Sequence, residues 1–153
     1  MPIYVKYNLE ELEIEYNSFE NIRDYDYVVY IDCTRNRLSL LPKLPKSLQK
    51  LSCWNNKLTS LPELPNSLQY IWCDNNQLSE LPKLPNSLQI LGCPYNQLIS
   101  LPELPNSITY MSCEINQLIS LPELPKSLIR LHCFNNQLTS LPELPKSIMY
   151  IFC

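Results

Sequence analysis

The stretch LPNSLQYIWCDNNQLSELPKLPNS, residues 64–87, decides the fold because its phrases return along most of the chain. With Leu68 as position 1, apolar residues occupy positions 1, 4, 6 and 11 of a 20-residue unit, and an asparagine occupies position 9. A fixed period of this length is typical of a solenoid, in which each repeat stacks on its neighbours. The same frame begins at Val28, Leu48, Leu88, Ile108, Leu128 and Ile148.

Each unit divides into two walls joined by a turn. Positions 3–5 predict a short strand with positions 1, 4 and 6 pointing inward, and copies of this strand stack in parallel about 4.8 Å apart. Positions 14–19 hold twelve of the fourteen prolines in Leu-Pro pairs, which exclude an α-helix and favour extended, polyproline II backbone. The pattern therefore predicts a repeat solenoid with a parallel β-sheet on one wall, extended segments on the other and little or no α-helix. We call these walls the strand face and the proline wall.

The repeats account for residues 28–153, as seven copies of which the last, from Ile148, is incomplete. Residues 1–27 contain seven acidic and two basic side chains, and we expect them to form an N-terminal cap over the end of the solenoid. Within this cap we favour a degenerate repeat. A capping helix is the alternative, because several of the same apolar residues share one helical face. The residues that fit the degenerate repeat are Leu9, Leu12, Ile14, Asn17 and Phe19.

The unit L-P-x-L-P-x-S-L-x-x-L-x-C-x-x-N-x-L resembles the short, 20-residue class of leucine-rich repeats. That class occurs in secreted effectors of Gram-negative pathogens and in proteins of giant amoeba-infecting viruses of the Mimivirus type. The cysteine at position 6 and the recurring NSLQ and NNQL phrases resemble the viral set more closely. The resemblance covers residues 28–153, and it implies protein–protein recognition without implying a common ligand.

Two columns of identical residues point into the solenoid. All seven cysteines occupy position 6, where a straight row hemmed in by leucines lacks the convergence of a zinc site or a disulfide, so we expect seven reduced, buried thiols. Metal or redox chemistry is the minor alternative. The asparagines at position 9 stand where the chain turns under the sheet, and an amide can pair the backbone groups stranded there. This structural ladder consists of Asn36, Asn56, Asn76, Asn96, Asn116 and Asn136.

The residues on the strand face differ from repeat to repeat, whereas the inward positions are nearly constant. Tyrosine, tryptophan and arginine, which dominate binding hot spots, accumulate at its outward positions and in the turns that follow. Self-stacking of lysine or arginine between tyrosines, which would merely stiffen the sheet, is the alternative for position 3. The expected partner-binding residues are Tyr30, Lys50, Trp54, Tyr70, Trp72, Tyr95, Tyr110, Arg130, His132, Phe134 and Tyr150.

One site on this face has a sharper expectation. Gly92 is the only glycine, and with Ser112 beside it we expect a notch about 14 Å across, three strand spacings wide, between Trp72 and His132. A local bend at Gly92 is the alternative. A pair between His132 and Glu114 is conceivable at diagonal distance, but no nucleophile or phosphate-binding loop accompanies it. We therefore expect no enzyme, no catalytic residue, no metal and no cofactor.

Charge and composition narrow the class of partner. The net charge of −3 disfavours nucleic acid, no apolar run is long enough to cross a bilayer, and the first residues lack the apolar core of a signal peptide. We expect a cytoplasmic protein, in the host cytoplasm if it is viral or an effector, that binds another protein. A carbohydrate-binding module using Trp54, Trp72 and Tyr110 is the runner-up, and a structural, self-assembling protein is the third candidate.

Two further expectations concern the remaining surfaces. Lysine, glutamate and asparagine at positions 16 and 19 are expected to keep the proline wall soluble without binding. The incomplete last repeat has Ile148, Ile151 and Cys153 but no asparagine turn and no proline wall. We expect this uncapped end to fray or to form an end-to-end homodimer, because it leaves strand groups and apolar surface unpaired.

Overall fold

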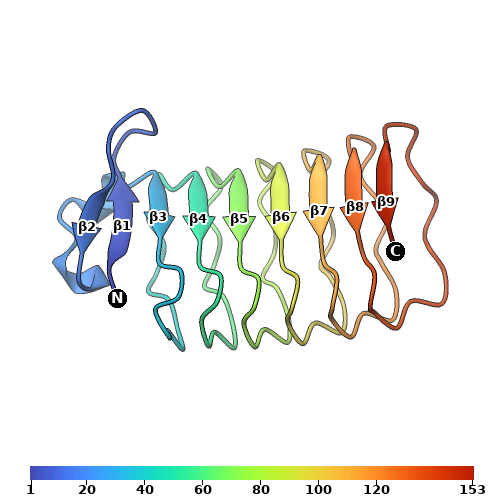
Figure 1. Cartoon of the computed structure of the whole chain (residues 1–153). Helices are drawn as coiled ribbons and strands as arrows, with labels where there is room; N and C mark the ends of the chain where they lie inside the picture. Colours follow the sequence, from blue (N-terminus) through green and yellow to red (C-terminus); the bar gives the residue numbers. More distant parts are fainter.

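The computed structural model describes all 153 residues, which form nine strands and two short 3₁₀ helices. The repeats contribute β3 Tyr30–Asp32, β4 Lys50–Ser52, β5 Tyr70–Trp72, β6 Ile90–Gly92, β7 Tyr110–Ser112, β8 Arg130–His132 and β9 Tyr150–Phe152. Residues 1–27 contribute β1 Ile3–Lys6, β2 Ile14–Tyr16, η1 Phe19–Asn21 and η2 Tyr25–Tyr27. All nine strands belong to one sheet, in the order β2-β1-β3-β4-β5-β6-β7-β8-β9 (Figure 1).

The seven repeat strands lie parallel and in register, which confirms the predicted solenoid. Each strand residue pairs with the residue twenty positions further on, as Ile31 does with Leu51 and Leu51 with Ile71. The middle residue of each strand points inward and is buried in β3–β8, whereas most of its neighbours remain half-buried or exposed on the strand face. In β9 the middle residue, Ile151, is half-buried because no further repeat packs against it.

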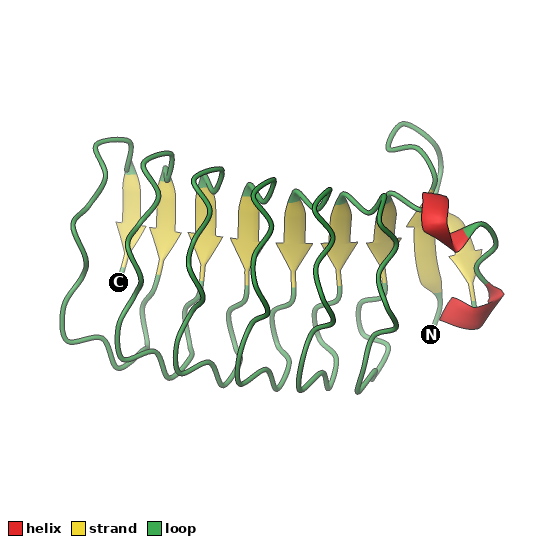
Figure 2. Ribbon diagram, turned by 180° about the vertical axis from the view of Figure 1, so that it is seen from behind, coloured by secondary structure: helices red, strands yellow, loops and turns green.

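The proline wall contains neither helix nor strand, as the Leu-Pro pairs predicted (Figure 2). Its end is tied back to the sheet by a column of serines at position 20. In each case the hydroxyl donates to the carbonyl oxygen of position 1 in its own repeat, as Ser67 Oγ does to Leu48 at 2.6 Å and Ser87 Oγ to Leu68 at 2.6 Å. These serines recur in every wall, so the period itself is the signal for a shared role.

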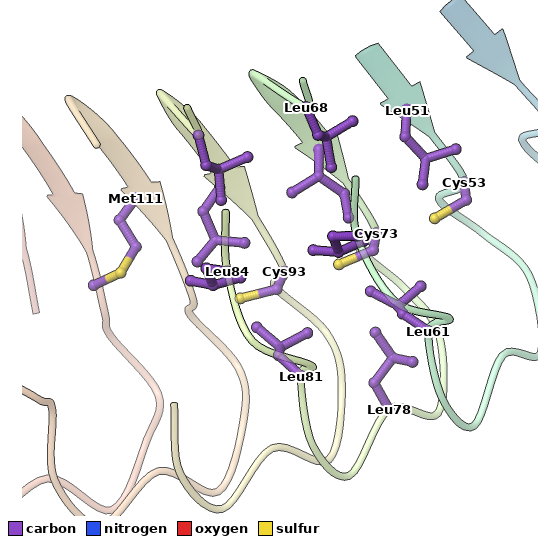
Figure 3. Packing of buried hydrophobic residues seen from close by; sticks show 14 of the residues in the cluster. Leu51, Cys53, Leu61, Leu68, Cys73, Leu78, Leu81, Leu84, Cys93 and Met111 are labelled. Carbon is purple, nitrogen blue, oxygen red and sulfur yellow. The ribbon is translucent and has the colours of Figure 1, made fainter. Parts of the chain in front are cut away.

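The core is a continuous stack of leucine and cysteine columns between the two walls. Figure 3 shows Leu51, Cys53, Leu68 and Met111 pointing from the sheet side toward leucines of the turn and the wall such as Leu81. A fully buried leucine contributes roughly 1.5–3 kcal/mol to folding, so the stack is the main source of stability. The thiols also form weak hydrogen bonds, since Cys73 Sγ donates to the carbonyl of Gly92 at 3.3 Å.

The turn after each strand is held by the asparagine side chains. Asn76 Nδ2 donates to the carbonyl oxygens of Cys53 and Cys73, both at 3.0 Å, and its Oδ1 accepts from the N–H of Leu58 at 3.0 Å. Asn56, Asn96, Asn116 and Asn136 make equivalent bonds. Each amide therefore joins its own repeat to the preceding one.

Residues 9–20 form neither the degenerate repeat nor the helix considered from the sequence. Strand β2 pairs antiparallel with β1, which itself pairs antiparallel with β3. Leu12 and Ile14, which the degenerate repeat would place inside, are 89% and 44% exposed. The reason is the overlooked strand β1: its Ile3 and Val5 are buried against the core and cover the edge of β3, so residues 9–20 are not needed there.

The expectation of seven free thiols is also wrong at one end of the column. Cys133 and Cys153 form a disulfide, with their Cα atoms 4.5 Å apart, while the other five cysteines are free and buried. In-register side chains do point the same way inside the stack. Cys153 differs because it is exposed, with no leucine row packed on its outer side, so its side chain can turn toward Cys133.

Candidate functional site

The strand face presents the outward side chains at positions 3 and 5 of seven parallel strands. Of the expected binding residues, the strands carry Tyr30, Lys50, Tyr70, Trp72, Tyr110, Arg130, His132 and Tyr150, and the turns that follow carry Trp54, Tyr95 and Phe134. Strand pairing brings the outward side chains of neighbouring strands close together, but only some of these residues make ring contacts with one another.

A row of four rings crosses the face from β5 to β9. The ring centroids of Trp72 and Tyr110 lie 5.7 Å apart, those of Tyr110 and His132 5.6 Å, and those of His132 and Phe152 4.9 Å. Spacings of this size are typical of favourable tilted and edge-to-face aromatic pairs. We call this set the aromatic row. Phe152 was absent from the expected binding residues, although it stands in the same position 5 column as Trp72 and His132.

The row exists because Gly92 lets Trp72 lie across β6. A side chain at Gly92 would place its Cβ 2.1 Å from Cε3 of the Trp72 indole, so only glycine accommodates the ring there. The indole thereby covers β6 and meets Tyr110 on β7. The expected notch between Trp72 and His132 is therefore absent, since Trp72 and Tyr110 fill the space that the sequence left open.

Cations stack on aromatic rings beside the row. Lys50 Nζ lies 4.9 Å from the ring centroid of Tyr70, and the guanidinium carbon of Arg130 lies 4.9 Å from that of Tyr150. Arg35 lies 4.6 Å over Trp54. The self-stacking weighed from the sequence thus does occur, but each cation covers one ring and the aromatic row remains separate from these pairs.

Acidic groups on the face are bonded locally. Asp32 Oδ1 accepts from the N–H of Thr34 at 2.9 Å, and Glu114 Oε2 accepts from Ser112 Oγ at 2.6 Å. Glu114 therefore pairs with Ser112, and the conceivable ion pair with His132 does not form, since the only ion pair within 4 Å joins Lys6 and Glu13. Partial burial raises the pKa of Asp74 above its usual value, and the charge of Glu114 adds to this rise.

The chemistry of the face is that of a contact surface. No group of three or more histidine, cysteine, aspartate or glutamate side chains is placed to hold a metal ion. Two hollows of about 380 Å³ lie between neighbouring copies of the proline wall, near Leu64 and near Leu144, and not among the aromatic side chains. A broad surface without a deep pocket suits another macromolecule better than a small ligand. No helix of the structure has the length and hydropathy needed to cross a bilayer.

Comparisons with known proteins agree with this architecture. A family model described as leucine-rich repeats in two copies matches residues 46–86. The structure is similar to YopM from Yersinia enterocolitica WA-314, with 40% identity over 76% of this chain and 26% of that one, and a TM-score of 0.75. It is also similar to a Shigella effector leucine-rich-repeat domain, with 40% identity over 81% of this chain and 57% of that one, and a TM-score of 0.77.

A third similar structure is YopM of Yersinia pestis, a leucine-rich effector protein, with 37% identity and a TM-score of 0.67 over 80% of this chain and 42% of that one. The chain thus spans between about a quarter and just over half of the length of these three proteins. No curated protein sequence matches the chain. All three relatives are bacterial, so the expected closeness to giant-virus repeats stays a prediction.

Proposed function

Because this chain is a leucine-rich-repeat protein that resembles the repeat domains of bacterial effectors, we propose that it binds another protein through its strand face. The observation that carries the proposal is the aromatic row of Trp72, Tyr110, His132 and Phe152, which spans five strands of the sheet. Aromatic side chains provide large contact area at a low cost in conformational entropy, which is why they concentrate in interfaces.

The fixed positions of these side chains favour binding. Ring contacts hold the row in place, and stacked cations hold Tyr70 and Tyr150. Ordering a free side chain on association costs about 0.5–1.5 kcal/mol, so a face whose large residues are already fixed loses less on binding. The cations beside the rings favour a partner that carries carboxylates opposite them.

The strand face is tested by substituting its residues and those of the proline wall in parallel. A set of Tyr70→Ala, Trp72→Ala and Tyr110→Ala is expected to weaken capture of the partner at least tenfold each, because each removes buried aromatic area. The matched set is Glu103→Ala, Lys126→Ala and Lys146→Ala, which should change affinity by no more than a few tenths of a kcal/mol. The partner is first identified by capture with the unmodified chain. Its affinity for each variant is then measured by surface plasmon resonance.

Circular dichroism keeps this test interpretable, because every variant must retain the spectrum of the unmodified chain. Loss of partner with the proline-wall set, and retention with the strand-face set, would place the interface on the opposite wall. Equal loss with both sets at unchanged spectra would also contradict the proposal.

A carbohydrate-binding role has less support. Sugar-stacking platforms need open ring faces, but the guanidinium of Arg35 lies over Trp54 and one face of Trp72 lies on Gly92. Binding on a glycan array that free sugar abolishes would favour this alternative. We likewise propose that the chain is not an enzyme, because its one histidine, His132, lies between two aromatic rings and no nucleophile is bonded to it.

Location and end-to-end pairing remain proposals. We propose a cytoplasmic setting, in the host cytoplasm for an effector or viral protein, by analogy with the effector repeat domains that the chain resembles. An end-to-end homodimer through the last repeat is supported by the half-buried Ile151 and by Tyr150 and Phe152, which are exposed beside the outer edge of β9. Light scattering of the Ile151→Lys variant against the unmodified chain tests this pairing.

A further inference from the structure

The turns of two neighbouring repeats carry an apolar patch that the other turns lack. At positions 8 and 12, the repeats starting at 48, 68 and 128 hold an asparagine followed by threonine or serine. The repeats starting at 88 and 108 hold Tyr95 with Ile99 and Ile115 with Ile119. These two turns lie side by side, since the N–H of Asn96 donates to the carbonyl of Ile115 at 3.3 Å. Ile99 and Ile119 are 59% and 63% exposed.

Two of these residues are kept in an unfavourable backbone conformation. Position 8 is left-handed in every complete repeat, with φ of 54° at Tyr95 and 55° at Ile115. Asparagine tolerates this conformation, whereas a β-branched residue does so only at a cost. Tyr95 is exposed and Ile115 is only half-buried, so these strained side chains contribute little to the stability of the chain. Burial against a second surface would be favourable, because it removes their apolar area from water.

The row of turns that carries this patch is basic toward the N-terminal end of the solenoid. Arg35, Arg37 and Lys57 lie in the turns of the first two repeats, where all three are exposed and none has an ion-pair partner. Lys57 and Tyr95 lie two strand spacings apart, about 10 Å at the normal spacing. The edge formed by these turns, which we call the turn edge, therefore offers the cations of Arg37 and Lys57 beside an apolar patch, while Arg35 is stacked on Trp54.

The complementary chemistry occurs in the loop between β1 and β2. Leu12 in this loop is 89% exposed, the highest value among the large apolar residues of the chain. The adjacent Glu10 and Glu11 are exposed and have no ion-pair partner. Figure 1 shows this loop above the sheet, whereas the turns that follow β3–β8 leave the strands at their lower ends. The loop therefore cannot reach the turn edge of its own molecule.

We propose that the β1–β2 loop of one molecule docks on the turn edge of a second copy of the chain. Leu12 packs on the patch formed by Tyr95, Ile99, Ile115 and Ile119, and the carboxylates of Glu10 and Glu11 face the cations of Arg37 and Lys57. The two surfaces differ, so the contact is heterologous and leaves a free loop and a free edge at the ends of each assembly. The contact is small and partly ionic, so the association is weak and sensitive to salt.

Sedimentation velocity of the 153-residue chain across a concentration series, at low and high salt, tests the proposal. The mean sedimentation coefficient is expected to rise with concentration at low salt and to fall back at high salt. Replacing Ile99→Ser together with Ile119→Thr inserts the residues of neighbouring repeats. This variant should lower the association constant about tenfold or more, because two apolar contacts are lost. A matched Lys126→Ser variant on the proline wall should associate like the unmodified chain.

A charge exchange gives the decisive result. The variant with Glu10→Lys and Glu11→Lys, and the variant with Arg37→Glu and Lys57→Glu, should each lose self-association. Their mixture should associate again, because the unmodified loop of the edge variant fits the unmodified edge of the loop variant, and the two altered surfaces also carry opposite charges. A chain that is monomeric throughout, or a mixture that fails to associate, overturns the proposal. Association that survives all these changes but is lost in Ile151→Lys also overturns it, in favour of the end contact at β9.

Discussion

At the residue scale, the fold depends on a few side chains that satisfy the backbone of the turn. The asparagine at position 9 pairs two carbonyl oxygens and one N–H that would otherwise be stranded beneath the sheet. The residue before it is left-handed, with φ between 52° and 57° at Asn55, Asn75 and Asn135. Hydrogen bonding and backbone conformation thus fix the turn together, and each can be perturbed separately.

Removing one amide from the middle of the ladder tests the hydrogen-bonding part. In Asn96→Ala, the N–H of Leu78 loses its partner, while the carbonyls of Cys73 and Cys93 each lose one amide donor and keep another, from Asn76 and Asn116. Leaving the buried N–H unpaired costs roughly 1–3 kcal/mol, measured as a drop in the free energy of urea unfolding. Lys83→Ala on the exposed proline wall is the control and should cost little. Equal unfolding midpoints for the two variants would remove the amides from the explanation of stability.

Backbone conformation is tested at Ile115, whose φ of 55° is unfavourable for a β-branched residue. Ile115→Asn gives this turn the residue found at the same position in three other repeats, and it should stabilise the chain by about 1 kcal/mol. The reverse change, Asn75→Ile, should destabilise by a similar amount. The measurement is thermal unfolding of both variants by circular dichroism. If Ile115→Asn lowers the melting temperature, the strain assigned to this position is not there.

At the scale of elements, the cysteine column is a buried strip whose ionisation opposes folding. Burial raises the pKa of Cys33 and of Cys113 to about 12. It also raises the pKa of Cys53, Cys73 and Cys93. The nearby charges of Asp32 and Glu114 add to the rise at Cys33 and Cys113. Each thiol therefore stays protonated in the folded chain after its unfolded counterpart has ionised.

The sign of the resulting pH dependence follows directly. The folded pKa values lie above the ordinary 9.0, so stability is complete below pH 9 and falls as the pH rises from 9 to about 12. Each thiol can remove at most about 1.4 kcal/mol per pH unit. Urea unfolding at a series of pH values should show this fall, and Cys73→Ala should show a shallower one. A slope that Cys73→Ala leaves unchanged would contradict burial of a titrating thiol at that position.

The sequence predicted the repeated elements well because each residue type recurs in the same environment. Leucine spacing, asparagine turns and paired prolines made the walls of all complete repeats readable. The first and last elements were misread, since a residue there meets neighbours that the period does not describe. Strand β1 covers the core in place of residues 9–20, and Cys153, exposed on one side, joins Cys133.

The strand face was predictable as a set of residues but not as an arrangement. The period places Trp72, Gly92 and Tyr110 on neighbouring strands, yet it does not say that the indole lies across glycine. Rotamers decide whether a gap stays open or is filled, and they depend on long-range contacts. An open notch was therefore expected where a continuous row of rings is found.

At the scale of the whole molecule, the two walls differ in what they offer a partner. The proline wall repeats the same short polar pattern from turn to turn, while the strand face changes from repeat to repeat and carries the aromatic row. A flat array of parallel strands, closed at one end by β1 and β2, sets this row on a surface long enough to meet another protein (Figure 1). Our proposal thus assigns recognition to the part of the molecule that does not repeat.

Hydroxyl-radical footprinting of the free chain and of its complex with the captured partner tests this assignment most directly. Binding through the strand face should lower the oxidation of Tyr70, Trp72 and Tyr110 severalfold, while Tyr27 in the cap and Leu144 on the proline wall, both exposed, keep their rates. Protection of Leu144 with unchanged oxidation of Trp72 and Tyr110 would show that the partner sits on the other wall and would contradict the assignment.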